Sequence, residues 1–186
     1  MSCPLVPWTN ETYESGRILG SSVSEIAWRR LREKSGVTYG AYAYNSTQPG
    51  GASSLNIGGL FQNNAAEYAI STYLDLIDLA SKGEFDESIV ATAKWSRARE
   101  TVLAQQSSNQ MMNYLSSSHA SGRGLDYLTS IPEFISAVNT DTMKELMTAC
   151  VGHEVFTVLG PLEYTETAAK NLGLDYEIVD LSLIHI

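Results

Sequence analysis

A short run of residues combines a guanidinium and a phenol in a way that suits peptide binding: Leu31-Arg32-Glu33-Lys34-Ser35-Gly36-Val37-Thr38-Tyr39. Arg32 lies at the end of a predicted helix and Tyr39 at the start of a predicted strand. We expect the glycine turn between them to bring both side chains to one rim. A phenol donates a hydrogen bond to a carbonyl oxygen that becomes negative during attack, and a guanidinium holds a carbonyl or carboxylate in fixed geometry. Because helix-capping rules also explain most of this run, a purely structural interpretation stays open.

Other residues with catalytic potential form weaker patterns. The histidines are His119, His153 and His185, and none has a second histidine one helical turn away. The adjacent pair His153-Glu154 does not supply the i, i+4 ligand face of a zinc helix, so we predict no metal site in this chain. Ser118-His119 lacks a glycine elbow and an evident acid partner, which argues against a nucleophilic serine.

The elements that position these residues follow from periodicity. A helix is predicted from Asn10 to about Lys34, and Gly16 and Gly20 on it are expected to let a strand approach closely. A strand is predicted over 37–45, with Tyr42 and Tyr44 on one face and Tyr39, Ala41 and Ala43 on the other. It is expected to form a hairpin with a strand over 53–61. Further helices are predicted over 65–82, 87–106, 110–120, 141–151 and 165–172, and further strands over 2–6, 155–159 (buried) and 176–180.

The order of these elements predicts the fold class. A hairpin precedes a block of helices, and strands return at the end. This order favours an α+β fold, a two-layer sandwich in which helices cover one face of a mainly antiparallel sheet. The absence of repeats and low-complexity linkers in the sequence predicts one domain over residues 1–180.

Composition narrows the function classes. The chain has 186 residues, 44% hydrophobic and 18% charged, which is ordinary for a globular protein. Its net charge of −9 argues against binding to nucleic acids or anionic membranes. The sequence shows neither a signal peptide nor a membrane-spanning run, so we expect a soluble chain of unknown compartment. Cys3 and Cys150 are far apart, which argues against a cysteine-framed zinc site and against a disulfide scaffold.

The run from Leu31 to Tyr39, after a long helix and before a hairpin, resembles the insulinase (pitrilysin-like) zinc metallopeptidase family. Other parts agree in order along nearly the whole chain. Ile57-Gly58-Gly59 follows in the next strand, and 131–141 resembles the segment before the family's penultimate helix. Val155–Pro161 resembles the family's closing strand and Gly-Pro turn.

The resemblance implies roles for the two site residues. In this family two homologous halves pair around a chamber; one half carries the zinc motif H-x-x-E-H, and the other supplies an arginine and a tyrosine. Arg32 and Tyr39 are thereby expected to bind the peptide substrate, with Tyr39 beside the scissile carbonyl. This sequence contains no H-x-x-E-H. The resemblance therefore implies a C-terminal-type, non-zinc half that is inactive alone, with zinc held by a partner half on the same polypeptide or on another subunit.

Two further expectations concern the two ends of the sequence, and two alternative functions stay open. The family's strand before the first helix is longer than Ser2–Val6, which predicts an incomplete N-terminal strand. Residues 181–186 match one reading frame of a sequencing adapter, and we predict that they are an artefact. The alternatives to a peptidase half are a non-peptidase scaffold or processing-complex subunit of the same fold, and a peptide-binding module that uses a sheet edge.

Overall fold

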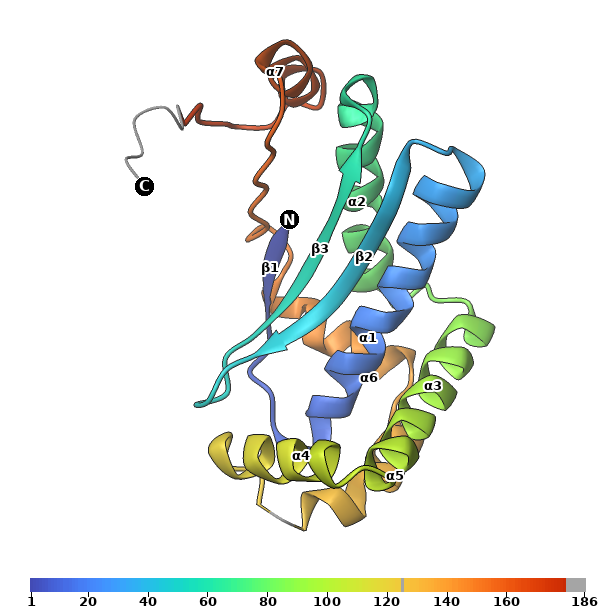
Figure 1. Cartoon of the computed structure of the whole chain (residues 1–186). Helices are drawn as coiled ribbons and strands as arrows, with labels where there is room; N and C mark the ends of the chain where they lie inside the picture. The colour runs from blue at the N-terminus through green and yellow to red at the C-terminus, as the bar shows by residue number, and fades with distance from the viewer. Residues whose placement is uncertain (125, 180–186) are drawn as a thin grey trace.

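A β-hairpin forms most of a small sheet (Figure 1). The computed structural model describes residues 1–124 and 126–179. Within them, strands β2 (Thr38–Thr47) and β3 (Ser53–Phe61) pair antiparallel, and β1 (Ser2–Leu5) pairs antiparallel with the other edge of β3, which gives the order β1-β3-β2. The predicted hairpin is confirmed.

The sheet has one covered and one open face. Along β2, buried and exposed side chains alternate, because successive strand side chains point to opposite faces of the sheet. Ala41 and Ala43 are buried on one face, and Tyr42 and Tyr44 are half exposed on the other. Helices cover only the face of the alanines. The predicted two-layer α+β architecture is therefore confirmed.

Helix α1 (Asn10–Trp28) lies along the covered face of the hairpin (Figure 1). Thr9 caps it through a reciprocal hydrogen bond with Thr12, and a π-helical turn, η1 (Arg29–Lys34), extends it. A Cβ atom added at Gly20 would lie 2.7 Å from the backbone nitrogen of Asn45 in β2. The expected close approach of a strand to the glycines of this helix is thus confirmed.

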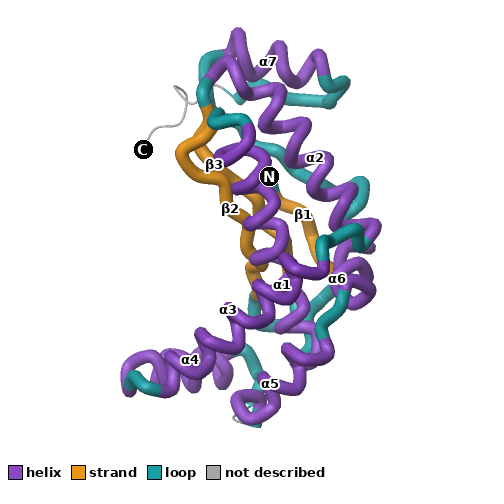
Figure 2. The backbone as a smooth tube through the Cα atoms, turned by 90° about the vertical axis from the view of Figure 1, so that its right-hand side faces the viewer, coloured by secondary structure: helices purple, strands orange, loops and turns teal. Residues whose placement is uncertain are grey.

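The remaining helices complete the layer and extend beyond the sheet at both ends (Figures 1 and 2). Helices α4 and α5 lie at one end and α7 at the other, where it packs against α2. Among the described residues, no helix combines the length and the apolar character needed to cross a membrane. The bounds are α2 (Ala66–Lys82), α3 (Glu87–Gln105), α4 (Ser108–Ala120), α5 (Tyr127–Ala137), α6 (Thr140–Leu146) and α7 (Leu162–Asn171), with short 3₁₀ turns η2 (Asn63–Ala65) and η3 (Met147–Ala149).

Most predicted helices are confirmed, but two predicted strands are wrong. Over 155–159 only Val155 makes a bridge, to Ser2, and Leu159 is 83% exposed. Beyond Val155 the segment pairs with no described strand, and a strand needs such a partner for its backbone hydrogen bonds. Over Tyr176–Val179 no strand forms either, and Asp180 lies outside the described residues, as does 181–186. Helix α5 has no counterpart among the predicted elements; Pro132 lies inside it and is usually unfavourable there.

The prediction against a disulfide is also wrong. Cys3 and Cys150 form one, with their Cα atoms 5.1 Å apart and 147 positions of sequence between them. Both cysteines are buried, because β1 packs against η3. The bond therefore joins the first strand to the helical layer.

We expect the double variant Cys3→Ala/Cys150→Ala to lose about 2–5 kcal/mol of unfolding free energy, because a cross-link between such distant residues restricts the unfolded chain. Urea unfolding of both proteins measures this loss. Dithiothreitol should destabilise the natural chain and leave the variant unchanged. Equal stability of the oxidised natural chain and the variant would contradict the structure.

We expect Gly20→Ala to lower the unfolding free energy by about 1–3 kcal/mol, because the new Cβ meets strand backbone rather than a movable side chain. Gly16→Ala is the matched comparison and should lose less stability, because its Cβ would lie 3.1 Å from the end of the Asn45 side chain rather than against strand backbone. Thermal unfolding compares the two variants. Equal stabilities would show that α1 and β2 are not in backbone contact at Gly20.

Candidate functional site

The end of the first helix fixes the position of Arg32. Leu31 is fully buried and its carbonyl accepts hydrogen bonds from the Val37 N–H at 3.1 Å and the Ser35 hydroxyl at 3.0 Å. Gly36, with φ of 66°, supplies the left-handed residue that this helix end requires. The buried Leu31 therefore anchors the turn to the core, and the next residue, Arg32, is exposed to solvent.

A β-bulge fixes the position of Tyr39. Thr38 lies opposite Phe61 and Gly40 opposite Leu60, so Tyr39 is the extra residue. The Thr38 hydroxyl is buried, accepts from the Gly40 N–H at 3.0 Å and donates to the Leu60 carbonyl. Bulges re-aim side chains beside functional sites, and here the Tyr39 side chain is 86% exposed.

The structure brings Arg32 and Tyr39 together. The guanidinium carbon of Arg32 lies 5.7 Å from the centre of the Tyr39 ring, within range of a cation–π contact. Neither side chain makes a hydrogen bond or ion pair with another described residue. Both polar groups are therefore accessible to a ligand. Their role in substrate binding stays a prediction.

Two stacked tyrosines form an aromatic surface on the open face of the sheet, further along the strand that carries Tyr39. Tyr42 and Tyr44 stack with ring centres 6.3 Å apart, and they share one face as predicted. A Cβ at Gly58 would lie 2.9 Å from the Tyr42 hydroxyl, so glycine makes room for this ring. Leu60 is also exposed on β3. The sequence predicted that Tyr42 and Tyr44 share a face. It did not predict that Gly58 makes room for Tyr42, because this depends on the strand register, which places the two residues opposite each other.

A second polar cluster is enclosed between α1, α3 and α5. Arg97 donates to both oxygens of Glu14, at 2.7 and 2.9 Å, and the hydroxyl of Tyr127 also donates to Glu14. Burial by itself lowers the pKa of Arg97, but the hydrogen bonds and negative charge of the Glu14 carboxylate have the opposite effect, and the net result is a raised arginine pKa. Burial and, next, Glu14 raise the pKa of Tyr127. Perturbed groups often mark catalytic sites, but Glu14 is fully buried, so this cluster holds helices together rather than meeting a substrate.

Glu14 is not one of the carboxylates that stabilise the N-terminus of α1, because only Glu11 lies in the first turn of this helix. Arg97 and Glu14 are 83 residues apart. No local pattern reveals that two charged residues on different helices meet in the interior.

The described residues do not fit a zinc site. No three of their His, Cys, Asp or Glu side chains gather closely enough to hold a metal ion. His119 ends α4 and His153 follows η3, both exposed, and His185 lies outside the described residues. Ser118 is buried while the adjacent His119 is exposed, so these two side chains do not form a nucleophile–base pair.

Comparison with known proteins identifies similar folds. No protein-family model matches this sequence, and no curated protein matches it. The periplasmic protease PqqL from Escherichia coli superposes with a TM-score of 0.68 and 12% identity, over 82% of this chain and 17% of PqqL. A peptidase M16 inactive domain from Pseudomonas fluorescens gives 0.63 and 18%, over 81% of this chain and 38% of that one. Pitrilysin gives 0.56 and 16%, over 81% of this chain and 16% of its own.

These similarities show the fold. The chain spans less than two fifths of each of these proteins. At such identities the likeness concerns architecture, and function has to be argued from the residues of the site. The fold is that of a half-domain of the M16, or insulinase-type, peptidases.

We expect Thr38→Val to lower the unfolding free energy by about 1–3 kcal/mol, because it leaves the Gly40 N–H and the Leu60 carbonyl without their partner. Thr38→Ser keeps the hydroxyl and is the control. Chemical denaturation measures both, and amide exchange at Gly40 reports the bulge directly. If valine and serine behave alike, the hydroxyl does not hold the bulge.

Proposed function

We propose that this chain is the substrate-binding, non-zinc half of a zinc metalloendopeptidase that cleaves peptides. The observation that carries the proposal is the Arg32–Tyr39 pair: both side chains are exposed, the guanidinium carbon lies 5.7 Å from the centre of the Tyr39 ring, and no other described residue forms a hydrogen bond or ion pair with either side chain. A cation and a phenol held side by side by a capped helix end and a bulge match the needs of peptide binding.

Each residue of the pair supplies a different interaction. The Tyr39 hydroxyl donates a hydrogen bond to the scissile carbonyl oxygen, and the bond strengthens as that oxygen becomes negative. The Arg32 guanidinium holds a neighbouring peptide carbonyl or a carboxylate of the substrate. Both interactions bind and orient a peptide. The bond-breaking chemistry belongs to a homologous zinc-bearing half, on the same polypeptide or on a separate subunit.

The comparisons support this division of labour. PqqL is a protease, and the Pseudomonas fluorescens domain is an M16 domain without activity. A fold found both in proteases and in inactive peptidase domains is consistent with a half that binds but does not cleave. The described residues of this chain likewise lack a cluster that holds metal.

The leading alternative is a non-peptidase scaffold or processing-complex subunit of the same fold. Such a subunit has no use for a free phenol beside a free guanidinium, and the pair therefore favours the peptidase half. A peptide-binding module is the third class. It would bind through strand backbone at a sheet edge, and its affinity would depend little on either side chain.

The test begins with the genomic locus, where we expect an H-x-x-E-H half in the same frame or in a neighbouring gene. In the protein co-expressed with that half, Tyr39→Phe should reduce kcat/KM for a fluorogenic peptide library about 30- to 1,000-fold, by analogy with the loss of one oxyanion donor worth about 2–4 kcal/mol. Arg32→Gln should mainly raise KM, because it removes a contact made equally before and during reaction.

Matched controls are available on the same elements. Tyr44→Phe changes an exposed tyrosine of the same strand, and Lys34→Gln changes an exposed cation of the same turn. Both should retain activity within about threefold, a change worth less than 1 kcal/mol. An unchanged rate in Tyr39→Phe favours the scaffold. Chelator-sensitive hydrolysis by the 186-residue chain alone would sink the proposal.

A further inference from the structure

Basic residues gather at the end of the first helix, on a chain that is acidic as a whole. Of the 12 Lys and Arg residues, four lie within the six residues of η1, although the net charge of the chain is −9. They are Arg29, Arg30, Arg32 and Lys34. The Arg32–Tyr39 pair therefore lies at the most densely basic segment of the sequence.

The helix end does not use these cations as caps. Basic side chains near a helix C-terminus commonly bond its last carbonyls. Here the Ser35 hydroxyl donates to the carbonyls of Arg30 and Leu31, at 3.1 and 3.0 Å, and the Val37 N–H donates to that of Leu31 at 3.1 Å. These two carbonyls are thus satisfied by a hydroxyl and a backbone N–H. The helix dipole favours positive charge in this turn, but it does not require a guanidinium over the ring of Tyr39.

Three of the four cations have no acidic partner among the described residues. Arg29 pairs with Glu25 at 2.7 Å. Arg30, Arg32 and Lys34 take part in none of the ion pairs of the described chain. Arg32 and Lys34 are exposed, and Arg30 is half-buried. The positive charge of η1 therefore faces solvent and is open to a negatively charged ligand.

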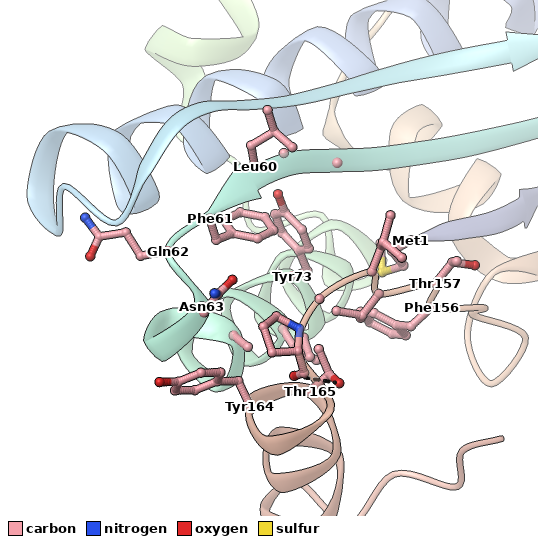
Figure 3. Close-up of a pocket in the computed structure, with 18 residues that line it drawn as sticks. Met1, Leu60, Phe61, Gln62, Asn63, Tyr73, Phe156, Thr157, Tyr164 and Thr165 are labelled. Carbon is pink, nitrogen blue, oxygen red and sulfur yellow. Dashed lines mark hydrogen bonds between the residues drawn. The ribbon is translucent and has the colours of Figure 1, made fainter. Parts of the chain in front are cut away.

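The segment beside this turn adds no carboxylate. The Gln62 N–H donates to the Val37 carbonyl at 3.0 Å, and Figure 3 shows Gln62 at the end of β3. The two residues that follow, Asn63 and Asn64, are uncharged as well. Glu33, the one acidic residue of η1, is exposed and forms no ion pair with another described residue. The turn thus keeps a net positive charge.

The guanidinium of Arg32 suits a carboxylate better than a neutral carbonyl. It lies beside the Tyr39 ring, with 5.7 Å between its carbon and the ring centre. The N–H donors of a guanidinium form a planar fork, and a carboxylate accepts two parallel hydrogen bonds from it. A peptide carbonyl has a single oxygen and no net charge. At a turn of net positive charge, Arg32 therefore favours the negatively charged partner.

We propose that the Arg32–Tyr39 pair selects peptides that carry a carboxylate, on an acidic side chain or at the C-terminus. The inference rests on the proposed function, since it names the class of substrate that the pair binds. Arg32 makes the contact, and the net positive charge of η1 disfavours a basic side chain at the same place. The carboxylate lies about two residues from the carbonyl that Tyr39 binds, because two residues of an extended peptide span about 6–7 Å.

The probes are acetyl-Ala-Phe-Ala-Glu-amide, acetyl-Ala-Phe-Ala-Gln-amide and the second peptide with a free C-terminal carboxylate. Each is titrated into the isotopically labelled 186-residue chain, and shifts of the Tyr39 amide and the Arg32 Nε–H give the affinity. At about 10 mM ionic strength, where charges interact over about 30 Å, peptides with a carboxylate should bind about three- to tenfold more tightly than the neutral peptide. An advantage of only one of them identifies its source, the side chain or the C-terminus.

Variants separate a specific contact from general attraction between charges. Arg32→Gln should abolish the preference for a carboxylate, and Arg32→Lys should retain part of it, because lysine keeps the charge but loses the fork. Lys34→Gln is the matched control with the same change in net charge, and it should reduce the preference less than about twofold, because an exposed charge without direct contact contributes little. Equal losses in Arg32→Gln and Lys34→Gln would overturn the proposal.

Failure of this inference differs from failure of the proposed function. Equal affinity of the acidic and neutral peptides overturns the carboxylate preference and leaves substrate binding by the pair intact. If no peptide shifts Arg32 or Tyr39, substrate binding itself is contradicted. In the protein co-expressed with a zinc-bearing half, a large effect of Tyr39→Phe on kcat/KM without any preference for Glu over Gln peptides likewise contradicts this inference alone.

Discussion

The contact between α1 and β2 at Gly20 governs the geometry of the rest of the molecule. Helix and strand follow each other in sequence and lie so close that a Cβ at this position would overlap strand backbone. Arg32 leaves the end of the helical segment, and Tyr39 enters at the start of the strand. The distance between the two side chains is thus set by one helix–strand packing and one short turn. Any change that lifts α1 from the hairpin separates them.

Two buried links fix the elements around this contact: one joins α1 to other helices, and the other joins the sheet to the helical layer. The ion pair between Glu14 and Arg97 joins the first part of α1 to α3, and Tyr127 adds α5. A buried pair of this kind does not necessarily add net stability, but loss of one partner leaves a charge in the interior, typically at a cost of about 3–5 kcal/mol. It therefore selects one packing of the helices. The disulfide between Cys3 and Cys150 does the same for β1 and the helical layer.

Sequence patterns predicted the parts of this fold that depend on neighbouring residues. The hairpin, the helices α2, α3 and α7, and the glycines facing a strand all follow from periodicity and small side chains. The disulfide and the Glu14–Arg97 pair depend on residues 147 and 83 positions apart, which no local pattern connects. The strand predicted over 155–159 has the right composition, but strand formation needs a partner, and among the described residues only Ser2 pairs with this segment, at Val155. At the site, the pairing of Arg32 with Tyr39 was predicted; the bulge was not, because the Thr38 side chain replaces a backbone bond there.

The exposure of Tyr39 bears on how the proposed function is achieved. A phenol that is 86% exposed competes with water for every carbonyl it meets, and its hydrogen bond then differs little in strength from one to solvent. The same donor stabilises a developing negative charge far more in a site from which water is excluded. The stacked rings of Tyr42 and Tyr44 on the open face of the sheet offer an apolar surface that a second half can cover. Under the proposed function, the Tyr39 hydrogen bond would therefore contribute to catalysis only after assembly with such a half excludes water from the pair.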